Sequence, residues 1–333
     1  MNQLPDEQQF SNEDINEEEE ESGYEDLSAD EEIPEVEKVS QAQELLKGNN
    51  YNIICNLSEN DDSNCFYAIN MDTHAKCAIK FMPKRRSISI RNKRQVSIFS
   101  TISHTNIIKI SQYIQAAKYY IYVTPYYNLG DLYFALLERE MKFTIQQVAK
   151  MMWGLIDLLN YLHNRNIVHG NISLENIILE SESKAILTGF SHASEQFIEV
   201  NDYKKTVFIA PEVEQNRILN FSTDIFALGT AFYFLLTKCN VNITSIDMDD
   251  DISQKLCPSA RNLLSGMLKP NPAERFGMNQ IIAHEFFIEF LPDGFRKSPL
   301  YFEVLNTTNY IMHLVDEGVK RTEEGPDDEY CYN

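Results

Sequence analysis

The residue pattern of this chain changes near Gly130, and this change constrains the fold more than any other feature. Before it, short runs rich in β-branched and aromatic residues are separated by turn residues, and they surround one expected helix at 91–102. The runs cover residues 51–55, 65–70, 76–81, 107–110 and 119–124. They predict a small five-stranded β lobe with one helix.

Apolar residues after Gly130 recur with helical spacing instead. In the stretch 148–162 they fall at i, i+3, i+4 and i+7, and they are Val148, Met151, Met152, Leu155, Leu158, Leu159 and Leu162. Short strands are expected at 176–179 and 185–187, and further helices near Ile225, at 260–268 and at 278–283. The chain is therefore predicted to be a bilobal α+β protein whose second, larger lobe is mainly helical.

The charge of the chain is concentrated at its start. The net charge is −21, and residues 1–37 hold 16 Asp and Glu with no Lys or Arg. Such a segment buries too little apolar surface to offset its ordering entropy, so residues 1–47 are predicted to be an acidic, disordered N-terminal tail. The small lobe is then expected at 48–127, the helical lobe at 128–292, and a C-terminal extension that could hold one helix at 293–333.

Composition argues against several classes of function. No basic footprint for nucleic acid is present, and the longest apolar run, 225–236, is too short to span a bilayer. The chain starts without an apolar signal region, and its six cysteines show no CxxC pairing. We therefore expect a cytoplasmic or nuclear protein that has neither nucleic acid nor membrane as a partner.

A series of short motifs follows in a recognisable order and spacing. They are Ala78-Ile79-Lys80, His104-Thr105-Asn106, Gly130-Asp131-Leu132, the loop from His169 to Asn176, Ala210-Pro211-Glu212, Asp224 before Leu228-Gly229, and Arg275 after Asn271-Pro272. Over residues 48–292 this series resembles the eukaryotic protein kinase superfamily of the Ser/Thr type. The closing His284-Glu285-Phe286-Phe287 is weakly similar to the polo-like and calmodulin-kinase-like branches.

The resemblance implies the bilobal protein-kinase fold and a set of structural residues. Glu212 would pair with Arg275, and Asp224 would support the catalytic loop. A hydrophobic spine would contain His169, Phe190, Phe99 and Ile110. These residues pack whether or not the protein catalyses a reaction.

The positions that carry chemistry in the family depart from its pattern together. In the family loop, an Asp accepts the proton of the substrate hydroxyl, but here that position is Asn171, whose carboxamide has no basic lone pair near neutral pH. Gly189 stands where the family has its metal-binding Asp, and Gln95 stands where a Glu pairs with the strand lysine. Gly170 and Ser173 replace an Arg and a Lys of the same loop.

The glycine-rich phosphate loop of the family is also missing. Its counterpart is the segment 58–65, Ser-Glu-Asn-Asp-Asp-Ser-Asn-Cys, which has no glycine. Glu59, Asp61 and Asp62 would place negative charge beside a triphosphate. Two like charges at about 4 Å repel by about 4 kcal/mol at an effective dielectric constant near 20. This loop is expected to disfavour ATP.

Some residues could still hold a nucleotide, if one binds. By the resemblance these are Lys80, Ala78, Cys65, Tyr126, Ile178 and Asn176. Apolar packing explains Cys65, Ala78 and Ile178 equally well. No metal site is expected, no cofactor is required, and the alternative is weak binding of ATP without Mg²⁺. The basic run at 84–94 is usually a solvated face, and docking of the acidic tail or of an acidic partner is its alternative interpretation.

The retained and the lost positions divide by role, which predicts a pseudokinase with no competent catalytic residues. Its expected function is to scaffold or allosterically regulate a protein partner, either an active kinase or another regulated protein. The alternative is a divergent Ser/Thr kinase that retains ATP-dependent phosphotransfer through Lys80 and Asn176, with Glu175 as a substitute carboxylate.

Overall fold

A computed structural model describes residues 35–60, 63–195, 197–199, 206–237 and 246–292. The chain forms two compact units. The smaller unit contains the described residues up to Asn128 together with Thr188–Ser194, and the larger unit contains Leu129–Leu187 and the described residues from Glu195 onward. The expected helix within 293–333 and the acidic residues 1–34 lie outside the described part of the chain.

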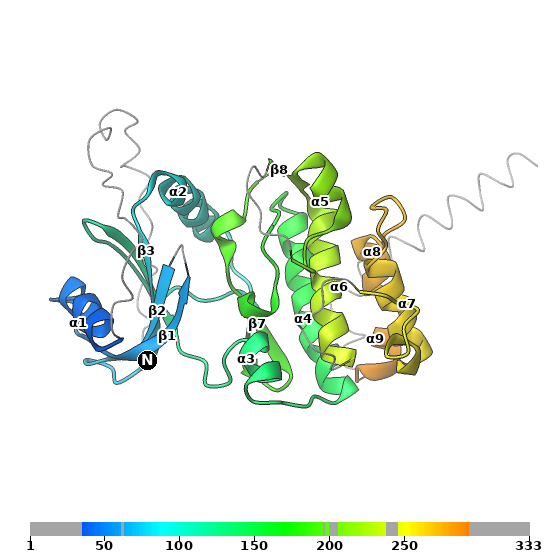
Figure 1. Ribbon diagram of the computed structural model, residues 1–333, viewed down its shortest axis with the longest axis horizontal. Helices are drawn as coiled ribbons and strands as arrows, with labels where there is room; N and C mark the ends of the chain where they lie inside the picture. Colours follow the sequence, from blue (N-terminus) through cyan, green and yellow to red (C-terminus); the bar gives the residue numbers. More distant parts are fainter. Residues whose placement is uncertain (1–34, 61–62, 196, 200–205, 238–245, 293–333) are drawn as a thin grey trace, which may run out of the picture. The chain divides into compact units, whose positions relative to one another are not determined.

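The smaller unit is built on one antiparallel sheet of five strands (Figure 1). The strands are β1 (Tyr51–Asn60), β2 (Ser63–Asn70), β3 (Lys76–Pro83), β4 (Gln112–Gln115) and β5 (Tyr119–Pro125), in the order β1-β2-β3-β5-β4. The predicted strand at 107–110 was wrong, because Ile107 and Ile108 are buried core residues that precede the strand. The actual edge strand, Gln-Tyr-Ile-Gln, is polar at both ends, so its composition does not predict a strand.

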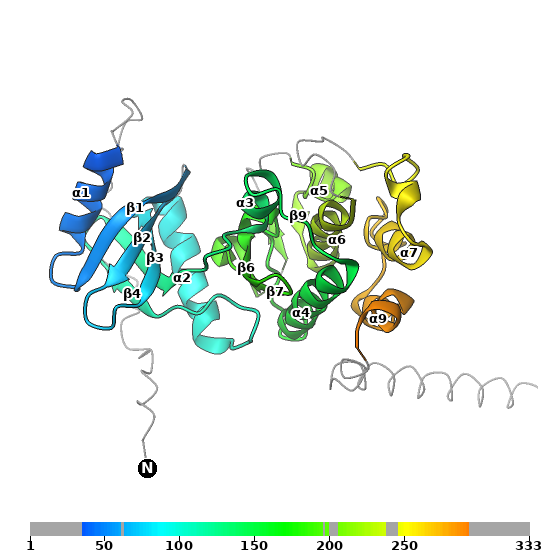
Figure 2. The same ribbon diagram turned by 90° about the horizontal axis from the view of Figure 1, so that it is seen from below.

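Two helices pack on opposite faces of this sheet, as Figure 2 shows, and only one was predicted. Helix α1 (Glu35–Leu45) buries Ala42 against one face and is followed by the buried Leu46, whereas α2 (Arg86–Thr101) buries Ile88 with Met82 on the other. Assigning residues 35–47 to the disordered tail was therefore wrong. Val39, Ala42 and Leu46 form a narrow apolar stripe that charged neighbours obscure.

The alternation of side chains along β3 decides which residues face each helix. Ile79 and Phe81 pack in the cluster with Ala42 of α1, and Met82 packs in the cluster with Ile88 of α2. Because neighbouring residues of a strand point to opposite faces, Lys80 lies on the face that carries α2.

The larger unit is mainly helical. Its helices are α3 (Leu132–Leu137), α4 (Ile145–His163), α5 (Pro211–Asn216), α6 (Phe221–Thr237), α7 (Pro258–Met267), α8 (Met278–Ile282) and α9 (Glu285–Phe290). Two small antiparallel sheets of two strands each pair β6 (Ile177–Ser181) with β7 (Lys184–Leu187) and β8 (Ile198–Glu199) with β9 (Ile218–Leu219). The five-stranded sheet and the helical unit confirm the predicted α+β kinase-like fold class.

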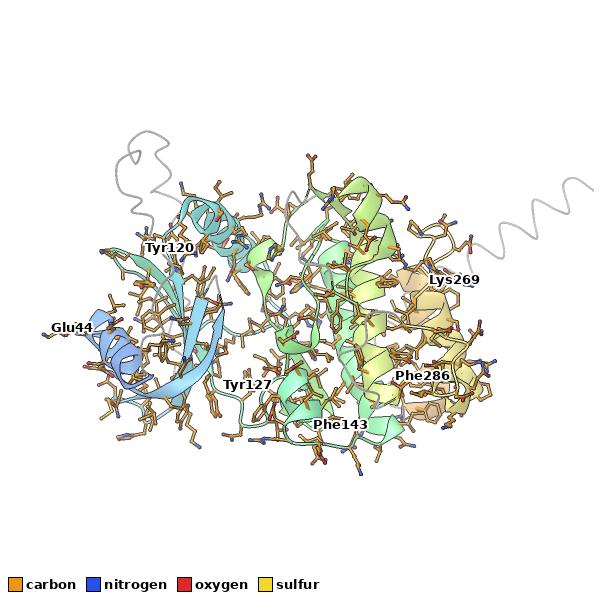
Figure 3. The ribbon with its side chains drawn as sticks, in the orientation of Figure 1. Glu44, Tyr120, Tyr127, Phe143, Lys269 and Phe286 are labelled. Atoms are coloured by element: carbon orange, nitrogen blue, oxygen red, sulfur yellow. The ribbon has the colours of Figure 1, made fainter. Side chains whose placement is uncertain are left out.

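Helices α4 and α6 carry the core of the larger unit. Thr144 and Gln147 form a capping box that starts α4, and the apolar stripe predicted for 148–162 is buried along it. Helix α6 is apolar on all sides and buried from Thr223 to Leu235, as expected for a central helix. Phe286 of α9, which is labelled in Figure 3, meets Phe232 of α6 edge to face, with ring centroids 5.3 Å apart.

Candidate functional site

The loop from Ile167 to Asn176 is held in place by one buried carboxylate of the larger unit. Asp224, in the first turn of α6, accepts hydrogen bonds from the backbone N–H groups of His169 and Gly170, each at 2.8 Å. His163 Nε2 lies 3.1 Å from the same carboxylate. Asp224 and His169 are buried, and a buried charge is tolerated only when it is fully hydrogen-bonded. The hydrogen bonds of Asp224 thus fix the backbone of the loop at residues 169 and 170.

The polar groups within the loop are carboxamides and hydroxyls. The N–H of Asn171 donates to His169 Nδ1 at 3.2 Å, and Asn176 Nδ2 donates to the carbonyl oxygen of Asn171 at 2.9 Å. A second, longer contact joins Asn176 Nδ2 to Ser173 Oγ at 3.4 Å. The amide of Asn176 therefore holds the backbone of Asn171, whose own carboxamide does not take up a proton near neutral pH.

Glu175 is the carboxylate nearest to this loop in sequence, and its side chain is exposed. Its charge acts on Asp131 at the start of α3. Burial raises the pKa of Asp131, hydrogen bonds from the α3 backbone oppose this effect, and the negative charge of Glu175 raises the pKa further. The negative charge of Glu175 thus disfavours ionisation of another carboxylate of the larger unit.

The segment Thr188–Ser194 belongs to the smaller unit and packs on α2. Gly189 has a φ of +81°, in the left-handed region that favours glycine. The buried ring of Phe190 lies 5.0 Å from that of Phe99, so the structure brings together two of the predicted spine residues. Ile110 packs beside Tyr120 and Tyr122 in the same unit, and His169 belongs to the larger unit.

His192 ties the same segment to α2 by hydrogen bonding. Its Nε2 lies 3.3 Å from Arg91 Nη1, and its Nδ1 lies 3.2 Å from Ser191 Oγ. A guanidinium group only donates, so Nε2 must be the acceptor. The proton of the neutral ring is therefore on Nδ1, which can donate to Ser191.

The predicted nucleotide residues divide between the two units. Lys80, Ala78, Cys65 and Tyr126 lie in the smaller unit, whereas Ile178 and Asn176 lie in the larger one. Lys80 is paired with Cys65 of β2 and with Tyr122 of β5 across the sheet. Burial raises the pKa of Cys65 to about 11, although the positive charge of Lys80 lowers it. Gln95 is half-buried on α2, where the family has a glutamate.

The segment expected to replace the phosphate loop is an antiparallel ladder. Ser58 pairs with Cys65, Glu59 with Asn64, and Asn60 with Ser63. Asp61 and Asp62, between the paired strands, lie outside the described residues. Without glycine, residues 58–60 and 63–65 pair as strands instead of forming a loop with a bare backbone.

Glu212 and Arg275 form a buried ion pair in the larger unit. Arg275 Nη1 and Nη2 lie 2.6 and 2.9 Å from the two carboxylate oxygens of Glu212. The guanidinium also donates to the carbonyl oxygens of Ser222 and Lys269. It therefore joins α5, the start of α6 and the segment before α8.

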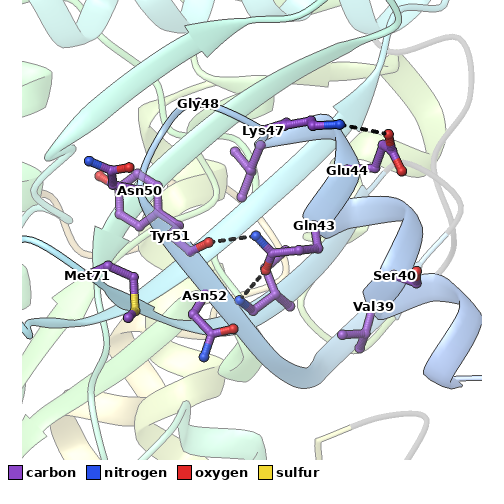
Figure 4. A pocket seen from close by; sticks show the side chains of 12 residues that line it. Val39, Ser40, Gln43, Glu44, Lys47, Gly48, Asn50, Tyr51, Asn52 and Met71 are labelled. Carbon is purple, nitrogen blue, oxygen red and sulfur yellow. Dashed lines mark hydrogen bonds and ion pairs between the residues drawn. The ribbon is translucent and has the colours of Figure 1, made fainter.

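The sequence analysis missed two features of the smaller unit. One is Gln43 of α1, whose Nε2 donates to the carbonyl oxygen of Tyr51 at 2.7 Å while its Oε1 accepts from the N–H of Ile53 at 2.8 Å (Figure 4). Gln43 thereby pairs with edge strand β1 as a neighbouring strand would. A cavity of about 690 Å³ lies beside this contact, between α1 and β1.

The other missed feature is a buried polar network under α2. Tyr122 Oη donates to Asn92 Oδ1 at 2.6 Å, and Asn92 Nδ2 donates to Tyr113 Oη at 3.0 Å. Burial raises the pKa of Tyr122. The available signal was a polar residue, Asn92, four positions after Ile88 on the buried stripe of the helix.

The smaller unit has a five-stranded antiparallel sheet with a helix on the face that carries Lys80. The larger, helical unit has a loop supported by Asp224 and a buried Glu212–Arg275 pair. Together these features define a protein of the kinase-fold class. The protein kinase domain model matches residues 51–287. The chain therefore belongs to the protein kinase family.

Curated relatives agree with this assignment. The chain is 26% identical over 238 residues to serine/threonine-protein kinase PLK4 of Drosophila virilis, covering 65% of this chain and 30% of that protein. It is 29% identical over 252 residues to CBL-interacting serine/threonine-protein kinase 17 of Arabidopsis thaliana, covering 69% of this chain and 58% of the relative. The matches thus span less than two thirds of these relatives' own length.

Two kinds of feature are absent from the described residues. No helix among them is both long and apolar enough to cross a membrane. In the same residues, no group of three or more His, Cys, Asp or Glu side chains could hold a metal ion.

Proposed function

We propose that this member of the kinase family is a pseudokinase, which acts as a non-catalytic scaffold or allosteric regulator of a protein partner. The observation that carries the proposal is the contrast within one loop. Asp224 and Asn176 hold the backbone of residues 169–171 by short hydrogen bonds, yet the residue so positioned is Asn171. The hydrogen bonds that position the loop are present, but the side chain at residue 171 is a carboxamide and not a carboxylate.

The metal position supports the same proposal. Gly189 offers no oxygen ligand from a side chain, and hard divalent ions prefer carboxylates. Loss of a general base costs about 10²- to 10⁴-fold in rate, and loss of a metal clamp removes several kcal/mol of transition-state stabilisation. These effects are not additive, but either one alone would lower the rate of transfer by about 100-fold or more.

The second candidate is a divergent Ser/Thr kinase, and the relatives favour it. Both are named as kinases, and this chain keeps Lys80 and Asn176. The position of Glu175 argues against its use as a substitute base, since the side chain is exposed and its charge acts on Asp131. The two candidates differ in one measurable property, which is phosphoryl transfer that depends on Lys80.

The test is transfer from labelled ATP, with Mg²⁺ or Mn²⁺, to the chain itself and to generic protein substrates. It compares the wild-type chain with Lys80→Ala, Asn176→Ala and the control Lys118→Ala, an exposed lysine of the β4–β5 turn. We expect equal background counts in all four, because a contaminating kinase is insensitive to these changes. Transfer that Lys80→Ala abolishes and Lys118→Ala leaves intact would establish the kinase instead.

The proposal also includes weak binding of nucleotide without metal, or no binding. A ligand at 100 times its dissociation constant stabilises a protein by about 2.7 kcal/mol, so thermal unfolding with ATP is a sensitive measurement. We expect the same small shift, or none, with and without Mg²⁺. A large shift that requires Mg²⁺ would contradict this part of the proposal.

The regulatory role requires a partner. Affinity purification of the full chain followed by mass spectrometry would identify candidates. A partner whose activity changes when the purified chain is added would support the role, and partners that bind without any change in activity or assembly would argue against it.

A further inference from the structure

Opposite charges are segregated along this chain to an unusual degree. Residues 73–130 contain ten Lys and Arg and no Asp or Glu, while residues 1–37 contain 16 Asp and Glu and no Lys or Arg. The basic stretch forms β3, α2, β4 and β5 of the smaller unit. Blocks of like charge of this kind often serve as interaction surfaces.

Helix α2 presents the densest part of this positive charge. Its sequence has no acidic residue at all, and its first turn follows Arg85 without a side-chain cap or a carboxylate to compensate the helix dipole. Lys93 is exposed and Arg94 is half-buried. Ile90, one turn earlier on the same side, is 55% exposed. The surface of these three residues, here called the α2 stripe, is both basic and apolar.

The cations of the stripe are not neutralised within the described part of the chain. Lys93 and Arg94 form no ion pair with any described carboxylate. Arg91 is engaged with His192, and Lys84 lies over the ring of Tyr120 at 5.1 Å. Positive charge that no described carboxylate neutralises attracts an acidic ligand.

We propose that residues 6–21 of this same chain bind the α2 stripe. This segment carries nine Asp and Glu and two apolar residues, Phe10 and Ile15, either of which could contact the exposed Ile90 beside the two cations. Its composition is thus complementary to the stripe in charge and in apolar character.

The chain length between the two sites is sufficient. Residues 22–34 connect the acidic segment to α1, which packs on the face of the sheet opposite to α2. Thirteen residues reach about 43 Å when extended. A compact unit of about 100 residues has a radius of gyration near 13 Å, so the segment can pass around the sheet edge. Tethering gives millimolar effective concentrations, at which weak ionic contacts are populated.

Residues 6–21 would bind the α2 stripe reversibly. Single surface ion pairs are weak and are screened by salt, so the bound segment exchanges readily and yields to a more strongly acidic partner. The inference concerns the outer surface of α2 and is independent of whether the domain transfers phosphate.

The test is carbodiimide crosslinking of the full chain at low salt, which joins carboxylates to lysines that touch them, with the products mapped by mass spectrometry. We expect residues 6–21 to crosslink to Lys93 in preference to the exposed Lys76 and Lys118. Arg94→Glu, which keeps Lys93 as the reporter, should lower the yield about two- to fivefold, the effect of one surface ion pair. Ile90→Ser should lower it too, and 0.5 M NaCl should abolish it.

Lys76→Glu is the matched control, since it reverses one exposed charge on β3 and should leave the crosslink at Lys93 unchanged. Unfolding curves establish that each variant folds. Even crosslinking of Lys76, Lys93 and Lys118, or no response to Arg94→Glu, overturns the proposal. Mixed isotope-labelled and unlabelled chains identify crosslinks between two copies, and a predominance of these also overturns it.

Discussion

Arg275 contacts both carboxylate oxygens of Glu212, at 2.6 and 2.9 Å, and both side chains are buried. The parallel geometry gives the pair two charge-assisted hydrogen bonds at once. The remaining donors of the guanidinium reach backbone carbonyl oxygens, including that of Lys269. The pair thus fixes the position of three segments of the larger unit.

We predict that Arg275→Ala lowers the free energy of unfolding by about 3–5 kcal/mol, because it leaves the carboxylate of Glu212 buried without its partner. Urea unfolding followed by circular dichroism measures the change. Arg261→Ala, at an exposed arginine of α7, should change stability by less than about 0.5 kcal/mol. A loss at Arg275 as small as that of the control would show that the pair is not essential to the larger unit.

Asn56 of β1 is expected to cost stability. Its Oδ1 is buried and has no hydrogen-bond partner among the described residues, and an unsatisfied buried acceptor costs about 1–3 kcal/mol. Asn56→Val should therefore raise the free energy of unfolding by about 1 kcal/mol. Valine also suits a strand.

Asn52→Val is the matched comparison for this prediction, because Asn52 is exposed on the same strand. It should be nearly neutral. If Asn56→Val destabilises the protein while Asn52→Val does not, the amide of Asn56 makes a bond that the valine removes.

Much of the fold follows from local patterns, for reasons that particular elements make clear. The stripe along α4 was predicted from the repeat of its apolar positions, and these positions are buried. Helix α1 was missed because its packing depends on β1, including the two bonds from Gln43 to the backbone of the edge strand. No pattern within residues 35–47 predicts that this segment packs on β1.

In the candidate site, too, some features follow from local sequence and others depend on residues far apart in the chain. A motif read from the sequence identified Asn171 and Gly189 as substituted positions, because residue identity alone decides whether a carboxylate is present. The support of the loop by His163, in addition to Asp224, needs coordinates, since these residues are 61 positions apart. The tautomer of His192 likewise depends on a distant partner, Arg91.

Stability should fall below neutral pH partly through His284. Burial lowers the pKa of this residue below 6.5, although Glu285 acts in the opposite direction. Its Nδ1 accepts from the N–H of Phe286 and its Nε2 lies 2.9 Å from Asn262 Oδ1, an arrangement that suits the neutral ring. Below pH 6.5 the unfolded chain takes up the proton more readily than the folded one, so stability decreases as pH falls.

His284→Asn tests this assignment, because asparagine also accepts a hydrogen bond at the start of a helix and does not titrate. Unfolding free energies at pH 7.5 and 5.5 should differ more for the wild type than for the variant. Equal pH dependence of the two proteins would show that His284 does not contribute.

Cys65 should react slowly with alkylating agents, and its rate should report on Lys80. The reactive form is the thiolate, and with a pKa of about 11 only about 0.1% of the thiol is ionised at pH 8. We expect iodoacetamide to modify Cys65 about 100-fold more slowly than a thiol of ordinary pKa, as measured by mass spectrometry. Because Lys80 lowers this pKa, Lys80→Ala should slow the reaction further, whereas Lys80→Arg should not. Rapid modification of Cys65 would contradict the raised pKa, and an unchanged or faster reaction after Lys80→Ala would mean that the two side chains do not interact across β2 and β3.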